Sequence, residues 1–342
     1  MAGVSVTWET LELHTARPFG IARWTHSTYP RTFVTFGRDG VVGRGEAAPN
    51  AFYGETGGTV AAVLPLLADA LTDGWDWDGL HDRLTARMPS GHPSVKCALE
   101  MAALEWSARA AGVPVWRLLG LAPTPLPESS YTVSLGPLED MRAGAREAVS
   151  RGHGVLKVKL GTGRDEAIVE ALRAEAPGVR LRVDANAAWD RAGARRMLDV
   201  LDAARVELVE QPLAAGDLEG HAALRRVSRL PLVADESLHH VSDVPRLAGA
   251  FDGVNLKLAK LGGPLRALTA LRLARAHGLQ VMLGCMIESS LGIAAAAHLA
   301  GLADWADLDG ALLLADDPFT GLQWEAGRLS RPTGVGWGVE RA

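Results

Sequence analysis

The chain has 342 residues, of which 48% are hydrophobic and 22% are charged, and its formal net charge is −5. Such a composition is typical of a globular protein with one large domain and a smaller companion. It offers no basic surface for nucleic acid and no polybasic flank for a membrane, so we expect neither as a partner. Cys97 and Cys285 are too few for a disulfide framework, and the start "MAGVSVTWETLEL" lacks a signal-peptide pattern, so we expect a cytoplasmic protein.

The first third of the chain predicts an α+β unit. Residues 4–14 and 32–48 alternate apolar and polar residues, as antiparallel strands do, and an "RDG" turn lies inside the second stretch. The segment between them, "TARPFGIARWTHST", is predicted to be a loop. From Gly57 to Gly112 the apolar positions follow a helical period, and Ser94 is the predicted N-cap of the last helix. Three prolines in "LAPTPLPESS" then predict a boundary.

The remainder of the chain alternates short β-branched runs with amphipathic helices. Five runs end in polar residues spaced 22 to 26 positions apart, at Lys159, Asp184, Glu210, Asp235 and Lys257. One strand, one helix and two loops need about that length. With "YTVSLG" before them and "QVMLGCMIE" and "ADLDG" after them, the runs predict an eight-stranded α/β barrel of the TIM type, whose catalytic groups follow the strands. A doubly wound open sheet is the alternative, but the glycine-rich first turn of that fold is missing.

Lysine is scarce in this chain, with only five among 35 Lys and Arg residues, and four of the five form two close pairs. Arg stays protonated in proteins, whereas Lys can lose its proton in a suitable environment. The pairs Lys157 with Lys159 and Lys257 with Lys260 therefore predict general bases. Lys157 and Lys159 would point to one side of a strand, and their repulsion predicts a lowered pKa for at least one of them. A solvated surface lysine is the alternative, which the apolar surroundings disfavour.

Three carboxylates end three successive predicted strands. Asp184, Glu210 and Asp235 would meet at one mouth of the barrel, where they would repel one another unless a cation lay between them. Oxygen ligands are those that Mg²⁺ prefers, so the spacing predicts one Mg²⁺. Each residue alone would more often be a helix cap.

The order of the motifs KVK, DAN, EQP, ADES and NLK resembles the enolase superfamily, in the subgroup of the muconate lactonizing enzymes. The resemblance covers essentially the whole chain. It implies a modified (β/α)8 barrel at residues 124–314. It also implies an α+β capping domain at residues 1–123, completed by a C-terminal segment, residues 315–342, that returns to the cap.

The same resemblance implies roles for the lysines and the carboxylates. Lys159 and Lys257 would be an acid/base pair on opposite faces of the substrate α-carbon, and Lys157 would be a neighbouring ammonium group. The expected Mg²⁺ ligands are Asp184, Glu210 and Asp235.

A second set of residues is similar to the substrate contacts of dipeptide epimerases. Asp307 and Asp309 in "ADLDG" would lie on one face and hold the substrate's α-ammonium group, although a turn-forming Asp-x-Asp-Gly is an even alternative. Arg23 matches the arginine with which L-Ala-D/L-Glu epimerases bind the side-chain carboxylate. Thr132 and Glu288 are also expected near the substrate. Glu288 would be the partner of a lysine there, and a helix N-terminal acid is the alternative.

These resemblances imply a Mg²⁺-dependent enzyme that epimerises the C-terminal residue of a dipeptide, with L-Ala-D/L-Glu as the expected substrate and the recycling of cell-wall peptides as the family's setting. An o-succinylbenzoate synthase or N-acyl amino acid racemase on the same scaffold is the nearest alternative. A barrel that binds dipeptides without catalysis is an alternative of another class. Assembly into a homo-oligomer stays open.

Overall fold

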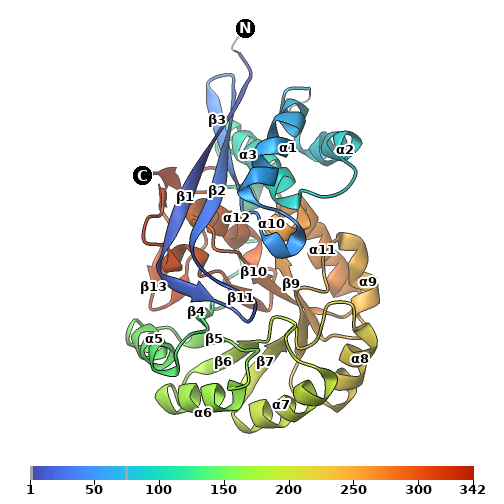
Figure 1. Cartoon of the computed structure of the whole chain (residues 1–342). Coiled ribbons are helices and arrows are strands. Elements are labelled where there is room, and N and C mark those ends of the chain that lie inside the picture. The colour runs from blue at the N-terminus through green and yellow to red at the C-terminus, as the bar shows by residue number, and fades with distance from the viewer. Residues whose placement is uncertain (1–2, 74–75) are drawn as a thin grey trace.

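The N-terminal part of the protein is a three-stranded antiparallel sheet with helices packed beside it (Figure 1). The computed structural model describes residues 3–73 and 76–342. The sheet has the order β1-β2-β3, with β1 at Ser5–Gly20, β2 at Thr25–Arg38 and β3 at Val41–Ala47. Asp39 and Gly40 take positive φ between β2 and β3, which confirms the predicted turn.

The hairpin of β1 and β2 is longer than the sequence predicted. The segment predicted to be a loop continues both strands, and only residues 21–24 connect them. The register shifts between His14 and Phe19, where Pro18 has no N–H to donate to the partner strand. Beyond this shift the tip of the hairpin extends to the barrel, where the Leu135 N–H donates to the Gly20 carbonyl at 2.9 Å.

Helices α1 (Gly57–Leu67), α2 (Trp77–Arg87) and α3 (Pro93–Ala110) complete the cap. Helix α3 lies so close to β3 that a Cβ at Gly45 would approach the Ala98 carbonyl oxygen to 1.9 Å. This contact requires glycine.

Ser94 is not the N-cap that the sequence predicted. Helix α3 begins two residues earlier than an N-cap at Ser94 would imply, at Pro93, whose missing N–H suits the first helical position. The Glu55 carboxylate caps the helix instead, because it accepts from the Ser94 N–H at 3.1 Å and from the Ser94 Oγ at 2.7 Å. Gly112 follows the helix with a positive φ, as predicted.

The described part of the chain forms one eight-stranded sheet in which neighbouring strands are also neighbours in sequence, from β4 to β11. All of its strand pairs are parallel. Its strands are β4 (Tyr131–Val133), β5 (Val155–Lys159), β6 (Arg180–Asp184), β7 (Val206–Glu210), β8 (Leu232–Ala234), β9 (Gly253–Lys257), β10 (Gln280–Gly284) and β11 (Trp305–Asp307).

The sheet closes into a barrel, as predicted. Ser129, just before β4, forms a parallel bridge with Ala306 in β11, and the Ser130 N–H donates to the Ala306 carbonyl at 3.0 Å. The sequential strand order and this closure exclude the doubly wound alternative. Helices connect the strands around the outside (Figure 1). The helices after the cap are α4 (Val115–Leu118), α5 (Leu138–Ser150), α6 (Asp165–Glu175), α7 (Arg191–Ala203), α8 (Leu218–Val227), α9 (Val244–Leu247), α10 (Leu258–Leu261), α11 (Pro264–Ala276) and α12 (Ser290–Ala300).

Alternate residues of each barrel strand face the helices and the interior. In β5, Leu156 and Val158 belong to the main apolar core with the helices, so Lys157 and Lys159 face the interior. Two positions before Glu210, Asp235, Gly284 and Asp307, the interior holds a separate apolar cluster of Leu208, Val233, Met282 and Trp305. The interior is therefore filled with side chains, and Asp184, Glu210 and Asp235 lie at its carboxyl end.

The segment after the barrel contacts the cap. It contains the short strands β12 (Phe319–Thr320), β13 (Trp324–Glu325), β14 (Arg328–Leu329) and β15 (Glu340–Arg341). The Trp337 indole N–H donates to the Arg44 carbonyl at 3.2 Å, and the Arg341 guanidinium lies 2.8 Å from the Glu9 carboxylate. The boundaries at 123 and 314 stay a prediction. Among the described residues, no helix combines the length and apolarity needed to cross a membrane.

Candidate active site

A cavity of about 310 Å³ lies at the carboxyl ends of the barrel strands. Two segments of the cap cover it, namely the tip of the β1–β2 hairpin and residues 50–57. Its floor includes Lys157, Lys159, Lys257 and Asp235. The cavity therefore combines charged barrel residues with a cover from the cap.

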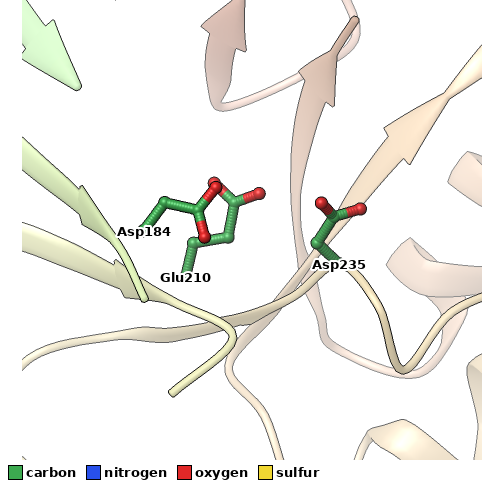
Figure 2. Close-up of side chains that lie close together, drawn as sticks. All are labelled: Asp184, Glu210 and Asp235. Atoms are coloured by element: carbon green, nitrogen blue, oxygen red, sulfur yellow. The ribbon is translucent and has the colours of Figure 1, made fainter. Parts of the chain in front are cut away.

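Three carboxylates meet beneath this cavity. Asp184 and Glu210 end β6 and β7, Asp235 directly follows β8, and Figure 2 shows the three side chains turned toward one another. One oxygen from each lies within 4.8 Å of the others, and all three residues are buried. Hard carboxylate oxygens at this spacing fit a single divalent cation such as Mg²⁺.

Lysines compensate part of this buried negative charge. Burial acts to raise the pKa of Asp184, but the Lys159 and Lys157 ammonium groups outweigh it and lower this pKa to about 2. The Lys159 Nζ lies 2.7 Å from an Asp184 oxygen. Burial and the nearby Asp184 charge raise the pKa of Glu210 to about 7. Neighbours on other strands thus shift the pKa values of these two carboxylates in opposite directions.

Lys157 does not have the lowered pKa that the lysine pair predicted. Its ammonium group lies 2.7 Å from Asp307, 2.7 Å from Glu210 and 3.3 Å from Asp184. Burial acts to lower the pKa of Lys157, but these carboxylates outweigh burial and raise it. The prediction concerned at least one lysine of the pair. For Lys157 it fails, because it considered the neighbouring lysine and not the carboxylates that other strands contribute.

The second lysine pair is divided between two roles. The Lys257 ammonium group lies 2.7 Å from an Asp235 oxygen and lines the cavity. Lys260 lies behind Asp235, where its ammonium group donates to the other Asp235 oxygen at 2.6 Å and to the Asn255 carbonyl at 3.1 Å. Lys260 is not among the described residues that line the cavity. Its position holds Asp235 in place and does not support the predicted general base.

Lys159 and Lys257 lie on opposite sides of the barrel mouth. They end β5 and β9, which are four strands apart in a ring of eight. Strands half a ring apart face each other across a closed barrel. The two ammonium groups therefore approach the cavity from opposite sides, with the three carboxylates on the strands between them.

Asp307 and Asp309 both line the cavity, although the strand ends at Asp307. Asp307 is fully engaged, because it accepts from the Ser130 Oγ at 2.6 Å and from the Lys157 Nζ at 2.7 Å. Asp309 accepts from the Thr132 N–H at 2.6 Å. Burial and the Asp307 charge raise the pKa of Asp309 to about 7. Thr132 also lines the cavity, so the structure brings this predicted set together.

Arg23 reaches the cavity from the hairpin tip, but its guanidinium group is already paired. It donates to the Glu236 carboxylate at 2.7 Å and to the Asn186 carbonyl at 2.5 Å. Glu236 and Asn186 were not among the predicted site residues. Their positions in the sequence could have indicated them, because Glu236 directly follows Asp235 and Asn186 is the second residue after Asp184.

Glu288 lies close enough to Lys257 for its charge to act on the Glu288 carboxyl group, so its predicted role as the partner of a lysine stays a prediction. It is buried, and it is not among the described residues that line the cavity. Burial and the neighbouring Glu46 charge raise its pKa to about 7, against the effect of Arg31. Glu288 therefore belongs to a buried cluster between the barrel and the cap.

Comparison with known proteins identifies relatives over nearly the whole chain. The model of the mandelate racemase/muconate lactonizing enzyme N-terminal domain matches residues 4–120, and the enolase C-terminal domain-like model matches residues 140–341. An L-Ala-D/L-amino acid epimerase of Pedosphaera parvula is 39% identical, over 86% of this chain and 85% of that protein. A hydrophobic dipeptide epimerase of Roseobacter litoralis is 36% identical, over 95% of both chains.

A solved structure extends this similarity to the fold. The dipeptide epimerase of Cytophaga hutchinsonii, complexed with Mg and the dipeptide D-Ala-L-Val, superimposes with a TM-score of 0.94 at 28% identity. The match covers 99% of this chain and 96% of that one.

Proposed function

This chain belongs to the enolase superfamily, in the mandelate racemase/muconate lactonizing enzyme family, and we propose that it is a dipeptide epimerase that uses two lysines and Mg²⁺. Its relatives are isomerases, and the protein is an enzyme. The observation that carries the proposal is the position of Lys159 and Lys257 on opposite sides of one cavity.

Opposed lysines provide what inversion at a carbon requires. An α-proton leaves one face of the substrate and another proton arrives on the opposite face, so one amine accepts and the other donates. In the reverse direction the two lysines exchange roles. This arrangement supports proton transfer at a single carbon in both directions, without loss of a leaving group.

Asp184, Glu210 and Asp235 would hold the Mg²⁺. When bound, the ion supplies fixed positive charge beside the substrate carboxylate, which favours removal of the α-proton. The Lys159 and Lys257 ammonium groups each donate to one of these ligands, Asp184 and Asp235, at 2.7 Å. These contacts hold both amines at the edge of the site that would bind the substrate carboxylate.

Asp309 supports a substrate with a free amino terminus. Asp307 is engaged by Lys157 and Ser130, whereas a buried second carboxylate beside it favours an incoming cation. Charge-assisted hydrogen bonds of this kind contribute roughly 1.5 to 3 kcal/mol each. An N-acylated amino acid has no such cation, so this pair favours dipeptides over the substrates of N-acyl amino acid racemases.

The test is proton exchange in D₂O. Purified protein with Mg²⁺ should add one mass unit to L-Ala dipeptides and produce the second epimer, whereas N-acetylated dipeptides should exchange far more slowly. Asp309→Asn should reduce exchange of the free dipeptides and leave that of the acetylated ones unchanged. Racemisation of N-acyl amino acids without exchange in any dipeptide would contradict the proposal.

The choice of L-Ala-D/L-Glu as substrate depends on Arg23. The relatives include epimerases named for L-Ala-D/L-amino acids, for hydrophobic dipeptides and for L-Ala-D/L-Glu, so their names do not select one side chain. The environment of Arg23 bears on this choice directly.

A further inference from the structure

Arg23 lies on the side of the cavity where the C-terminal residue of a dipeptide would be. Its two partners, Asn186 and Glu236, follow β6 and β8, so they flank β7. Strand β7 is half a ring away from β11, which carries the aspartates proposed to hold the amino terminus. The side chain of the substrate's C-terminal residue, which is farthest from that amino terminus, would therefore lie beneath Arg23.

Glu236 occupies the position that a substrate carboxylate would need. Its side chain is 1% exposed, and one of its oxygens lies 2.7 Å from the Arg23 guanidinium group. Arg23 is also 4.4 Å from the Phe52 ring centroid and 5.1 Å from that of Trp24. Hydrogen bonds and two aromatic rings thus hold the guanidinium group in place.

The other cations of the cavity are also engaged. Each Lys and Arg among the described lining residues already has a carboxylate or carbonyl partner, namely Lys157, Lys159, Lys257, Arg23 and Arg31. The wall near Arg23 is apolar and aromatic, with Ile21, Trp24 and Phe52 from the cap. A substrate carboxylate entering here would have to displace Glu236 from Arg23. Glu236 would then stay buried without its cationic partner and keep only the Asn186 Nδ2 donor at 3.3 Å, which is unfavourable.

We propose that Glu236 is a specificity-determining residue, which neutralises Arg23 so that the enzyme takes dipeptides with an uncharged, mainly apolar C-terminal side chain. This inference rests on the proposed epimerisation of dipeptides. It replaces the expectation that Arg23 selects an acidic side chain, because that expectation assumed an unpaired guanidinium group.

The experiment compares substrates of matched shape in the holoenzyme. kcat/KM for α-proton exchange is measured for L-Ala-L-Gln, L-Ala-L-Glu, L-Ala-L-Met and L-Ala-L-Lys. The wild type should favour the Gln and Met dipeptides over the Glu dipeptide by at least about 10-fold. Glu236→Gln should raise the Glu-to-Gln ratio by about 10-fold or more, because it frees Arg23 for the substrate. Adding Arg23→Met to this variant should remove the gain.

The Glu-to-Gln ratio compares kcat/KM for two substrates on the same enzyme, so a change in metal affinity affects both values alike. This matters because Glu236 is next to Asp235, a proposed Mg²⁺ ligand. Glu219→Gln is the matched control, since it removes the same charge from a side chain that is 88% exposed. Its Glu-to-Gln ratio should equal that of the wild type. A wild type that prefers the Glu or Lys dipeptide, or a ratio that Glu236→Gln does not change, would overturn the inference.

Failure of the proposed function would be visible separately, as no exchange with any dipeptide. Binding then tests the inference by itself, through tryptophan fluorescence titrations with the same dipeptides, since Trp24 lies beside Arg23. The wild type should bind the Gln dipeptide more tightly than the Glu dipeptide, and Glu236→Gln should reverse that order. Equal affinities in both proteins would overturn the inference.

Discussion

Two layers of the barrel interior are built by the same set of strands and are buried to a similar degree, but their side chains differ. In the deeper layer, two positions before the strand ends, Leu208 and Met282 are 0% exposed and pack in an apolar cluster. At the carboxyl ends, Asp184 and Glu210 are also 0% exposed, yet they are charged groups that depend on lysines from neighbouring strands. Burial of ionised groups is unfavourable unless each is paired. The charged residues at the carboxyl end are therefore explained by function and not by stability. The difference predicts that substitutions of the charged residues reduce activity with little effect on stability, whereas substitutions in the apolar layer reduce stability with little effect on activity.

The largest effect is expected at the two opposed lysines. Lys159→Ala and Lys257→Ala should each reduce epimerisation by at least about 10²-fold, because each removes one partner of a proton transfer. Each variant should still exchange the α-proton of one epimer in D₂O. Lys96→Ala removes the lysine that lies in the cap and should keep activity. Equal exchange of both epimers in either active-site variant would contradict the assignment.

The carboxylates should show the same contrast through the metal. Asp184→Asn, Glu210→Gln and Asp235→Asn should each weaken Mg²⁺ binding and turnover together, since each removes one anionic ligand. EDTA should inactivate the wild type and Mg²⁺ should restore it, while circular dichroism shows the fold unchanged. Full activity after thorough chelation would remove the metal from the mechanism.

In the apolar layer the consequence should be the reverse. Leu208→Ala leaves a gap in the apolar cluster and should lower the free energy of unfolding by about 2 to 5 kcal/mol. Because Leu208 is not among the described residues that line the cavity, kcat/KM at 20 °C below the variant's Tm should remain near that of the wild type. Loss of activity without loss of stability would mean that the two layers are not separable.

A smaller effect is expected from a buried carboxylate outside the barrel mouth. Glu100 in α3 accepts from the Leu265 N–H, and burial raises its pKa to about 8 against the effect of Arg266. An unfolded chain would ionise this group near 4.5, so stability is retained below that pH and is lost as pH rises toward 8. Glu100→Gln keeps the hydrogen-bond acceptor and removes the titration. Its Tm should therefore exceed that of the wild type increasingly from pH 5 to pH 8, and a constant difference across this range would contradict the assignment.

The sequence was sufficient for features with a regular spacing. Five of the eight barrel strands and the meeting of Asp184, Glu210 and Asp235 follow from strand ends that recur every 22 to 26 residues. The pairing of Arg23 with Glu236 could not be read in this way, because 213 positions separate the two residues and only the docking of the cap brings them together. The raised pKa of Lys157 has the same origin, since its carboxylate partners come from β6, β7 and β11.

The contacts between the cap and the segment after the barrel also set an order of assembly during synthesis. Strands β1 to β3 leave the ribosome first, but their partners Trp337 and Arg341 follow the entire barrel. Contacts of such long sequence separation form late, so the cover of the cavity would be the last part to assemble. Stalled nascent chains should therefore have a protease-sensitive β1–β2 hairpin until residues through Arg341 have emerged. Protection of the hairpin in chains stalled just after β11 would contradict this order.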